Sequence, residues 1–186
     1  MQSKIEIKKG DFLIAEPFML DPGFRRSAIL LCDHGIDGSV GFIMNKPIDI
    51  DISRLLPNFP DFKLKAFYGG PVATDTIHYI HKAGDIIDDS IYIADDIYWG
   101  GSFEQIKIMI EKGLIGDDDI MFFVGYSGWS QGQLQEEITI GSWIKTKYDL
   151  NYVFNNVKSN LWKLLLQDKG STFAVIADIK DEMNLN

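Results

Sequence analysis

The amino-acid sequence predicts a mixed α+β fold in a single domain that spans residues 1–186. Seven apolar runs of strand length follow one another in groups with short connections. Helical patterns are too few to supply a crossover after every strand, which argues against a wholly parallel, doubly wound sheet. Of the 186 residues 46% are hydrophobic, which suits one compact core. No internal repeat and no linker rich in proline, glycine and serine divides the chain.

The predicted strands are rich in β-branched and aromatic residues, and most are bounded by glycine, proline or aspartate. Asn45-Lys46-Pro47 closes the third of them, where we expect the proline to bar continuation and the asparagine to bond its own turn. The seven runs are Phe12–Ala15, Ser27–Cys32, Val40–Met44, Leu64–Tyr68, Thr76–Ile80, Ser90–Ile93 and Ile120–Val124.

The most clearly bounded helix is Ser102–Lys112, which begins with a capping-box pattern formed by Ser102 and Gln105. Ser130 and Gln133 repeat that pattern, so a strand, a turn and a short helix are expected in succession between residues 120 and 138. Further expected elements are the helices Ser159–Asp168 and Tyr152–Val157 and a last strand at Phe173–Ile179.

The charge and the cysteine content indicate which partners and which cellular location to expect. A formal charge of −9, from 27 acidic and 18 basic residues, repels phosphate backbones, so direct nucleic-acid binding is not expected. The single cysteine, Cys32, excludes an intrachain disulfide and favours a cytoplasmic location. The N-terminus is charged where a signal peptide is apolar, and no apolar run approaches the ~20 residues needed to span a bilayer. We therefore expect a soluble protein with no membrane segment.

The stretch Gly125-Tyr126-Ser127-Gly128-Trp129 invites comparison with the G-x-S-x-G elbow that presents a nucleophilic serine. In such an elbow the residue two places after the serine must be small, because strand and helix pass close together there. Trp129 occupies that place, so Ser127 is not expected to act as a nucleophile. The stretch is predicted to be a structural corner that packs Tyr126 and Trp129 and starts a helix.

Other chemistry-bearing residues favour structural roles. Cys32 ends an apolar run and is expected to behave as a small buried group, although a thiol near His34 could in principle be activated. His34 is more open to a binding role because it precedes the turn Gly35–Gly38. His78 and His81 lie three apart, on opposite faces of a strand, so a zinc site has weak support. No metal and no cofactor is expected.

Charged and glycine-rich segments are likewise expected to have structural roles. One of the arginines at 25 and 26 could bind an anionic ligand, but an ion pair with Glu136 or Glu137 is the preferred interpretation. Gly100 and Gly101 lead into Ser102, where an ordinary helix cap is favoured over an anion site. The acidic segments at 85–96 and 117–119 lack the ligand order of a calcium loop and are expected to be solvated.

Laid end to end, these pieces resemble the YqgE/AlgH family of bacterial proteins over roughly residues 10–145. The resemblance implies one mixed α/β domain with a largely antiparallel or mixed, partly closed barrel-like sheet flanked by helices. Members are often labelled transcriptional regulators, and the resemblance implies no particular chemistry. Residues 130–135 depart from the common G-P-G-Q-L-E pattern and put an amide, Gln135, where an acid would stand. The matching segments are Gly10–Pro17, Asp21–Ser27, His34, Gly38, Gly41, Asn45–Pro47, Tyr68–Val72, Gly100–Ser102, Gly125–Trp129 and Gly132–Leu134.

The sequence therefore favours a non-catalytic binding or regulatory protein with a protein or small-molecule partner, acting on transcription, if at all, through that partner. No catalytic residue is assigned. The candidate ligand-binding residues are Arg26, His34, Asn45, Gln133 and Glu137. Two alternatives stay open. One is an enzyme that uses His34, Arg26, Asn45 and the helix 133–137 in one cleft, and the other is a regulator that binds DNA directly, for which no basic recognition helix is evident.

Overall fold

The computed structural model describes residues 5–147, 149, 153–154 and 160–179. The strands are β1 (Phe12–Ala15), β2 (Ala28–Gly35), β3 (Gly38–Ile43), β4 (Pro47–Asp51), β5 (Lys65–Tyr68), β6 (Val72–His81), β7 (Ile91–Ala94), β8 (Ile97–Trp99), β9 (Ile120–Ser130) and β10 (Trp143–Thr146). The helices are α1 (Ile52–Leu55), α2 (Phe103–Glu111), α3 (Gln133–Thr139), α5 (Leu161–Gln167) and α6 (Ser171–Ala177).

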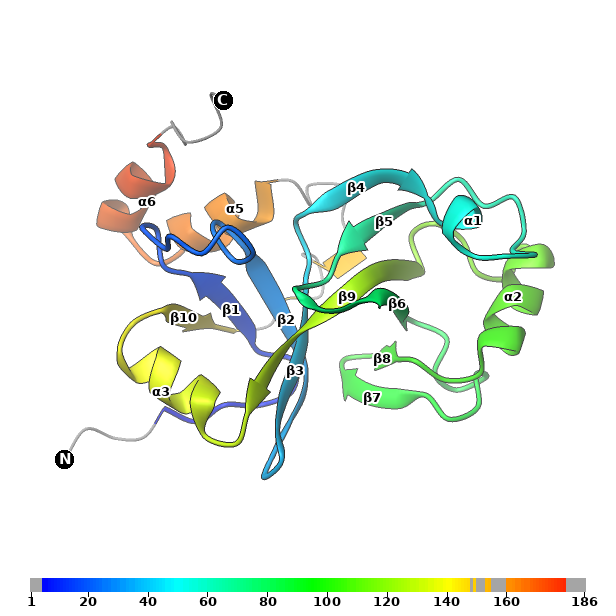
Figure 1. The fold of residues 1–186 in the computed structure, drawn as a ribbon, viewed down its shortest axis with the longest axis horizontal. Coiled ribbons are helices and arrows are strands. Elements are labelled where there is room, and N and C mark those ends of the chain that lie inside the picture. Colours follow the sequence, from blue (N-terminus) through cyan, green and yellow to red (C-terminus); the bar gives the residue numbers. More distant parts are fainter. Residues whose placement is uncertain (1–4, 148, 150–152, 155–159, 180–186) are drawn as a thin grey trace.

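The described strands form one sheet in the order β10-β1-β2-β3-β9-β6-β8-β7, with β4 and β5 attached beside β9 (Figure 1). Every pairing is antiparallel except that of β5 with β9. The predicted mixed fold with a largely antiparallel sheet is therefore confirmed. The sheet stays open, because β10 and β7 lie at opposite ends of the strand order.

Strand β9 is the centre of the fold because it borders β3, β5 and β6. Its two consecutive phenylalanines, Phe122 and Phe123, are both fully buried but belong to different core clusters. Phe123 stacks on Phe42 in the larger cluster, with ring centroids 4.7 Å apart. Phe122 packs in the smaller cluster, which Ile106 of α2 also joins. Because successive side chains of a strand point to opposite faces, β9 contributes a phenylalanine to each core cluster.

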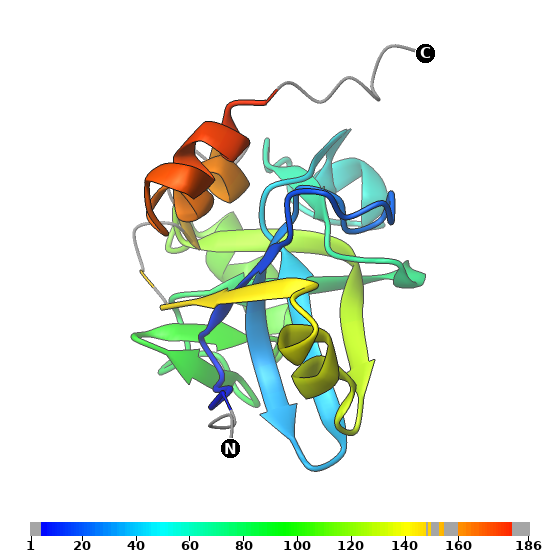
Figure 2. The ribbon, with the colours of Figure 1, turned by 90° about the vertical axis from the view of Figure 1, so that its left-hand side faces the viewer.

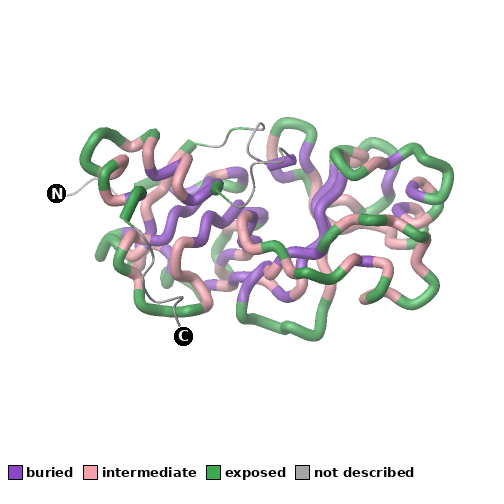
Figure 3. Tube along the Cα trace, turned by 90° about the horizontal axis from the view of Figure 1, so that it is seen from above, coloured by how far each residue is buried: buried purple, intermediate pink, exposed green. Residues whose placement is uncertain are grey.

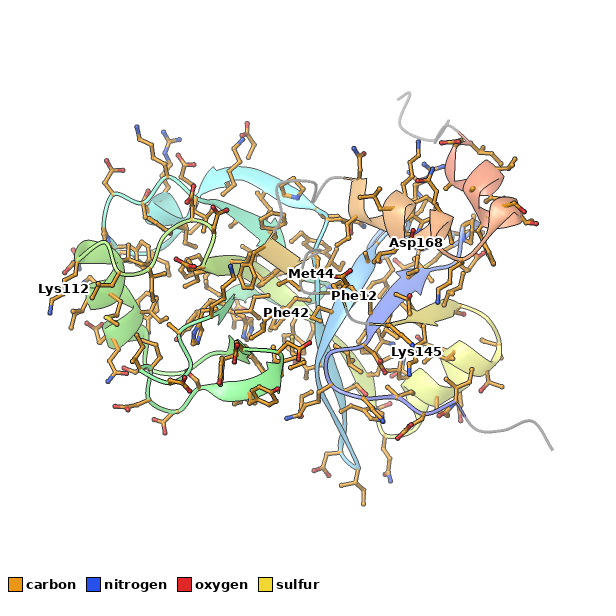
Figure 4. All side chains as sticks on the ribbon, turned by 180° about the vertical axis from the view of Figure 1, so that it is seen from behind. Phe12, Phe42, Met44, Lys112, Lys145 and Asp168 are labelled. Atoms are coloured by element: carbon orange, nitrogen blue, oxygen red, sulfur yellow. The ribbon has the colours of Figure 1, made fainter. Side chains whose placement is uncertain are left out.

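The buried chain runs through the middle of the molecule, and the exposed chain lies mostly in the connections (Figure 3). Phe12, Phe42 and Met44 lie together near the centre, whereas Lys112 lies at the far end beyond α2 (Figure 4). Helix α5 packs on β1, where the indole of Trp162 donates to the Ala15 carbonyl oxygen at 2.9 Å. In the described part of the chain, α3, α5 and α6 lie at one end of the molecule and α1 and α2 at the other (Figure 1).

The predicted corner at residues 125–129 is wrong, because β9 continues through it as far as Ser130. Gly125 has a φ of +66°, and the register with β6 shifts beside it, between the pairs Val72–Tyr126 and Ile77–Val124. A glycine in the left-handed region absorbs this irregularity, so the strand bends and goes on. The turn comes later, at Gly132, whose φ is +78° and which caps α3.

The predicted start of α2 is confirmed, whereas the predicted strand near the C-terminus is not. Helix α2 begins as predicted, with Ser102 accepting from the Gln105 backbone N–H. The strand expected at Phe173–Ile179 is wrong. The segment belongs to α6, where Phe173 and Ala177, four apart, both face the larger core cluster. Most of the candidate helix Tyr152–Val157 lies outside the described residues.

Sequence patterns did not indicate β4, α1, β8 or β10. Pro47 does not continue β3, in agreement with prediction, but it opens β4, whose pairing is with β5. Strand β8 is three residues long and follows a tight turn at Asp95 and Asp96, both with positive φ. Among the residues that the structure describes, none of the helices combines the length and the apolar character that crossing a bilayer demands.

Candidate functional site

The tip of the β2–β3 hairpin lies between two hollows. Gly35 and Gly38 pair with each other, and the residues between them carry the exposed side chain of Ile36, 78% accessible. A Cβ on Gly38 would lie 2.3 Å from the Trp129 carbonyl oxygen, so glycine is what allows β9 to approach the hairpin this closely. The close pairing of three strands makes the tip a fixed projection with a recess on each face.

The first recess, here named the acidic groove, has a volume of about 540 Å³, within the range of ligand pockets. Its floor is a row of cross-strand neighbours, Asp33 on β2, Val40 on β3 and Gly128 on β9. It is lined by Asp33, Gly35, Ile36, Asp37, Gly38, Ser39, Val40, Val72, Tyr126, Gly128 and Trp129. Two carboxylates and no cationic side chain are among these residues.

The second recess, here named the α3 hollow, lies on the other face of the same three strands and measures about 270 Å³. The neighbouring cross-strand row, His34, Ser39 and Trp129, points toward α3. Figure 2 shows α3 in front of the blue strands β2 and β3. The lining residues are His34, Gly35, Ile36, Gly38, Ser39, Ser130, Gln131, Gly132, Leu134 and Gln135.

Of the predicted binding residues, His34 lines the α3 hollow. Its Nδ1 lies 2.8 Å from the Ser39 hydroxyl, a buried group, and the ring is half-buried. Among the described residues the ring has one hydrogen-bond partner, at Nδ1, and none at Nε2. His34 thus borders a recess, and a ligand role for it stays a prediction.

Arg26 and Asn45 lie at the opposite end of β2. Asn45 accepts from the Ala28 N–H at 2.9 Å and donates to the Arg26 carbonyl oxygen at 2.9 Å, so its amide joins two chain segments and does not bond its own turn. The Arg26 guanidinium lies over the Trp162 ring, 5.0 Å from its centroid. Ala28 and His34 are six residues apart on one strand, about 20 Å at the usual rise. The single cleft that the enzyme alternative requires is therefore not formed by these residues.

Gln133 and Glu137 lie on α3 and hold two tryptophans. Glu137 Oε2 accepts from the indole N–H groups of Trp129 at 2.9 Å and Trp143 at 2.7 Å, and Oε1 accepts from the Gln133 amide at 2.9 Å. The side-chain oxygen of Gln133, Oε1, accepts in turn from the backbone N–H of Ser130. This bond is one half of the predicted capping box. Both side chains are thus engaged in joining α3 to the strands.

The two candidate nucleophiles are fully buried. The Ser127 hydroxyl donates to the Gly69 carbonyl oxygen at 3.0 Å. Burial, with the neighbouring charge of Asp33, raises the pKa of the Cys32 thiol far above its ordinary value, so the thiol stays protonated. An activated cysteine requires the opposite shift. Cys32 is therefore the small buried group that the sequence predicts.

The remaining histidines, His78 and His81, lie on β6 and contact other parts of the protein. His81 is buried, with Nε2 2.9 Å from the Gly100 carbonyl oxygen and Nδ1 accepting from the Ala83 N–H at 3.1 Å. His78 points to the other face and packs on Phe42 and Tyr126. In the described part of the chain, no three histidine, cysteine, aspartate or glutamate side chains are grouped so as to hold a metal ion.

The acidic groove was not predicted from the sequence. Its floor joins residues 33, 40 and 128, which only the pairing of three strands brings together. The one local signal is an isoleucine between two glycines at the hairpin tip, because a large apolar residue is unusual in an exposed turn.

Comparison with known proteins places the chain in a family. The model of the AlgH-like family (DUF179) matches residues 12–174. The UPF0301 protein of Chlorobium limicola is 35% identical over 181 residues, which cover 97% of each chain. The UPF0301 protein of Cytophaga hutchinsonii is 36% identical over 181 residues, 97% of this chain and 100% of the relative.

Two solved structures have the same fold. The crystal structure of DIP2367 from Corynebacterium diphtheriae superposes with a TM-score of 0.76 at 21% identity, over 95% of this chain and 94% of that one. The solution structure of AlgH from Pseudomonas aeruginosa gives 0.73 at 22% identity, over 98% and 100%. The resemblance found in the sequence is thereby confirmed, and the chain belongs to the AlgH-like family, whose members include the UPF0301 proteins.

Proposed function

We propose that this chain is a non-catalytic binding or regulatory protein of the cytoplasm that holds a protein partner at the β2–β3 hairpin tip. Any influence on transcription would then pass through that partner. The observation that carries the proposal is the exposed Ile36 between two recesses, on a projection fixed by its pairing with β9. An apolar anchor flanked by recesses and polar groups is the usual centre of a protein interface.

The state of the candidate reactive groups supports a binding role over a catalytic one. Ser127 and Cys32 are buried, and His81 bonds backbone groups through both ring nitrogens. Covalent catalysis by a serine or cysteine needs that nucleophile and a base within reach of each other and of a substrate. Ile36 borders both recesses at the hairpin tip, and Asp37 is exposed beside it.

The test uses Ile36 and a matched control, Ile140, which is 77% exposed at the end of α3. A photo-crosslinking amino acid is placed at either position in full-length protein inside the producing cells. The crosslinked protein is identified, purified and titrated against the unlabelled chain. We expect Ile36→Asp to weaken that complex at least tenfold and Ile140→Asp to leave it within twofold. Equal crosslinking at both positions, or equal effects of both substitutions, would contradict the proposal.

In this role the partner makes any contact with DNA, because the net charge of −9 on this chain opposes the phosphate attraction on which unspecific binding depends. An electrophoretic shift assay at two salt concentrations tests this assignment. The chain alone should shift no duplex at either concentration. A sequence-selective shift that weakens as salt rises would favour direct binding.

A further inference from the structure

The acidic groove differs from the α3 hollow in its charge. Asp33 and Asp37 are the charged side chains in its lining. Among the described residues the Asp37 carboxylate has no hydrogen bond or ion pair. Lys9 Nζ lies 3.9 Å from the Asp33 carboxylate, and both side chains are exposed. An exposed pair at that distance neutralises little of the charge. The groove therefore offers two carboxylates to a cationic group.

The wall that faces these carboxylates is apolar and aromatic. The Tyr126 ring lies over Gly128, so close that a Cβ at 128 would be 3.0 Å from the ring, and Val72 adds a methyl group nearby. The His78 ring, 5.6 Å from Tyr126 and nearly perpendicular to it, supports the tyrosine from one side. Within the described chain the Tyr126 hydroxyl has no hydrogen-bond partner. An aromatic face beside carboxylates suits a flat cation on an aliphatic stem.

Building on the proposed function, we infer that the acidic groove binds an arginine side chain of the partner. The guanidinium meets Asp33 and Asp37, and its aliphatic stem packs on Tyr126 and Val72. Arginine fits better than lysine because its planar group pairs with carboxylates and stacks on an aromatic ring. A second copy of this acidic chain is a poor occupant, since both copies carry a charge of −9.

The probe is a blocked peptide, acetyl-Gly-Val-Arg-Val-Gly-amide, titrated into ¹⁵N-labelled full-length protein. Matched peptides carry lysine or the uncharged isostere citrulline in place of arginine. The amide signals of residues 33, 37, 126 and 128 should shift with the arginine peptide. Citrulline should weaken binding at least about threefold, the loss expected for exposed ion pairs, and lysine should fall between. Shifts confined to other surfaces, or equal affinity for arginine and citrulline, would overturn the inference.

The protein control compares two pairs of exposed acids. Asp33→Asn with Asp37→Asn should reduce affinity for the arginine peptide at least about threefold and abolish its preference over citrulline. Asp117→Asn with Asp118→Asn removes the same charge elsewhere and should change affinity less than twofold. Equal losses in both double variants would mean that overall charge alone attracts the peptide, which also overturns the inference. If Ile36→Asp still breaks the crosslinked complex while the arginine peptide fails these tests, the proposed function stands and the arginine pocket does not.

Discussion

The indole N–H of Trp143 donates to Oε2 of Glu137 at 2.7 Å. The same oxygen accepts from Trp129 on β9, so one carboxylate joins α3 to two strands that belong to different parts of the sheet. The two indoles meet edge to face, with centroids 5.8 Å apart. Residues singled out in the sequence as ligand groups and as a corner filler thus prove to be partners of each other.

Glu137→Gln should destabilise the protein by about 1–2 kcal/mol, because hydrogen bonds to a charged acceptor contribute more than those to an amide. Unfolding in urea, followed by tryptophan fluorescence, measures the loss. Glu136→Gln is the matched control, since Glu136 is exposed one residue earlier on α3, and it should stay within about 0.5 kcal/mol of wild type. Equal effects of the two substitutions would show that the indole bonds contribute little.

Gly125→Ala should cost more stability than the same change at Gly113. Both glycines have a left-handed φ, +66° and +68°, so both variants bear a backbone penalty of about 1–2 kcal/mol. A Cβ at 125 would also lie 2.6 Å from the Gly70 carbonyl oxygen, whereas one at 113 would meet open space. In thermal unfolding, the free energy of unfolding of Gly125→Ala should therefore be at least about 1 kcal/mol lower than that of Gly113→Ala. A smaller gap would mean that β9 can shift away from residue 70.

Stability should fall as the pH rises above about 8.5, the usual pKa of a cysteine thiol in an unfolded chain. Burial raises the pKa of Cys32 in the folded state, so above that pH only the unfolded chain releases the proton, and the loss reaches about 1.4 kcal/mol per pH unit. Comparing Cys32→Ala with wild type between pH 7 and 10 isolates this slope from those of other groups. If the two slopes coincide, the thiol ionises as readily in the folded protein as in the unfolded one.

His81 should lower stability as the pH falls through about 6.5, the usual pKa of a histidine. Burial lowers its pKa in the folded state, although the hydrogen bond to Gly100 acts in the other direction. Protonation would also place a hydrogen on Nδ1, the atom that accepts from the Ala83 N–H. The ring should therefore titrate below 6.5 in an NMR experiment and carry its proton on Nε2 at neutral pH. Titration at or above 6.5 would contradict this assignment.

Much of the fold could be predicted because it depends on local patterns. The runs around Phe12 and Phe123 are apolar and short, and the Ser102–Gln105 cap is a four-residue pattern. The continuation of β9 could not be predicted, because glycine at 125 and 128 signals a turn locally. Only contact with β6 and β3 makes an irregular strand the better solution.

The candidate site was predictable only in part. His34 was noted because a turn follows it, which is a property of neighbouring residues. The acidic groove depends on Asp33 and Gly128, which are almost a hundred positions apart in sequence and become neighbours through β3. The roles of Gln133 and Glu137 depend likewise on two indoles from other strands.

The arrangement of Phe122 and Phe123 affects how the protein can unfold. Because β9 supplies adjacent rings to both core clusters, loss of this strand from one cluster also removes a large side chain from the other. We expect that a protease cut between residues 120 and 130 would therefore leave no stable fragment.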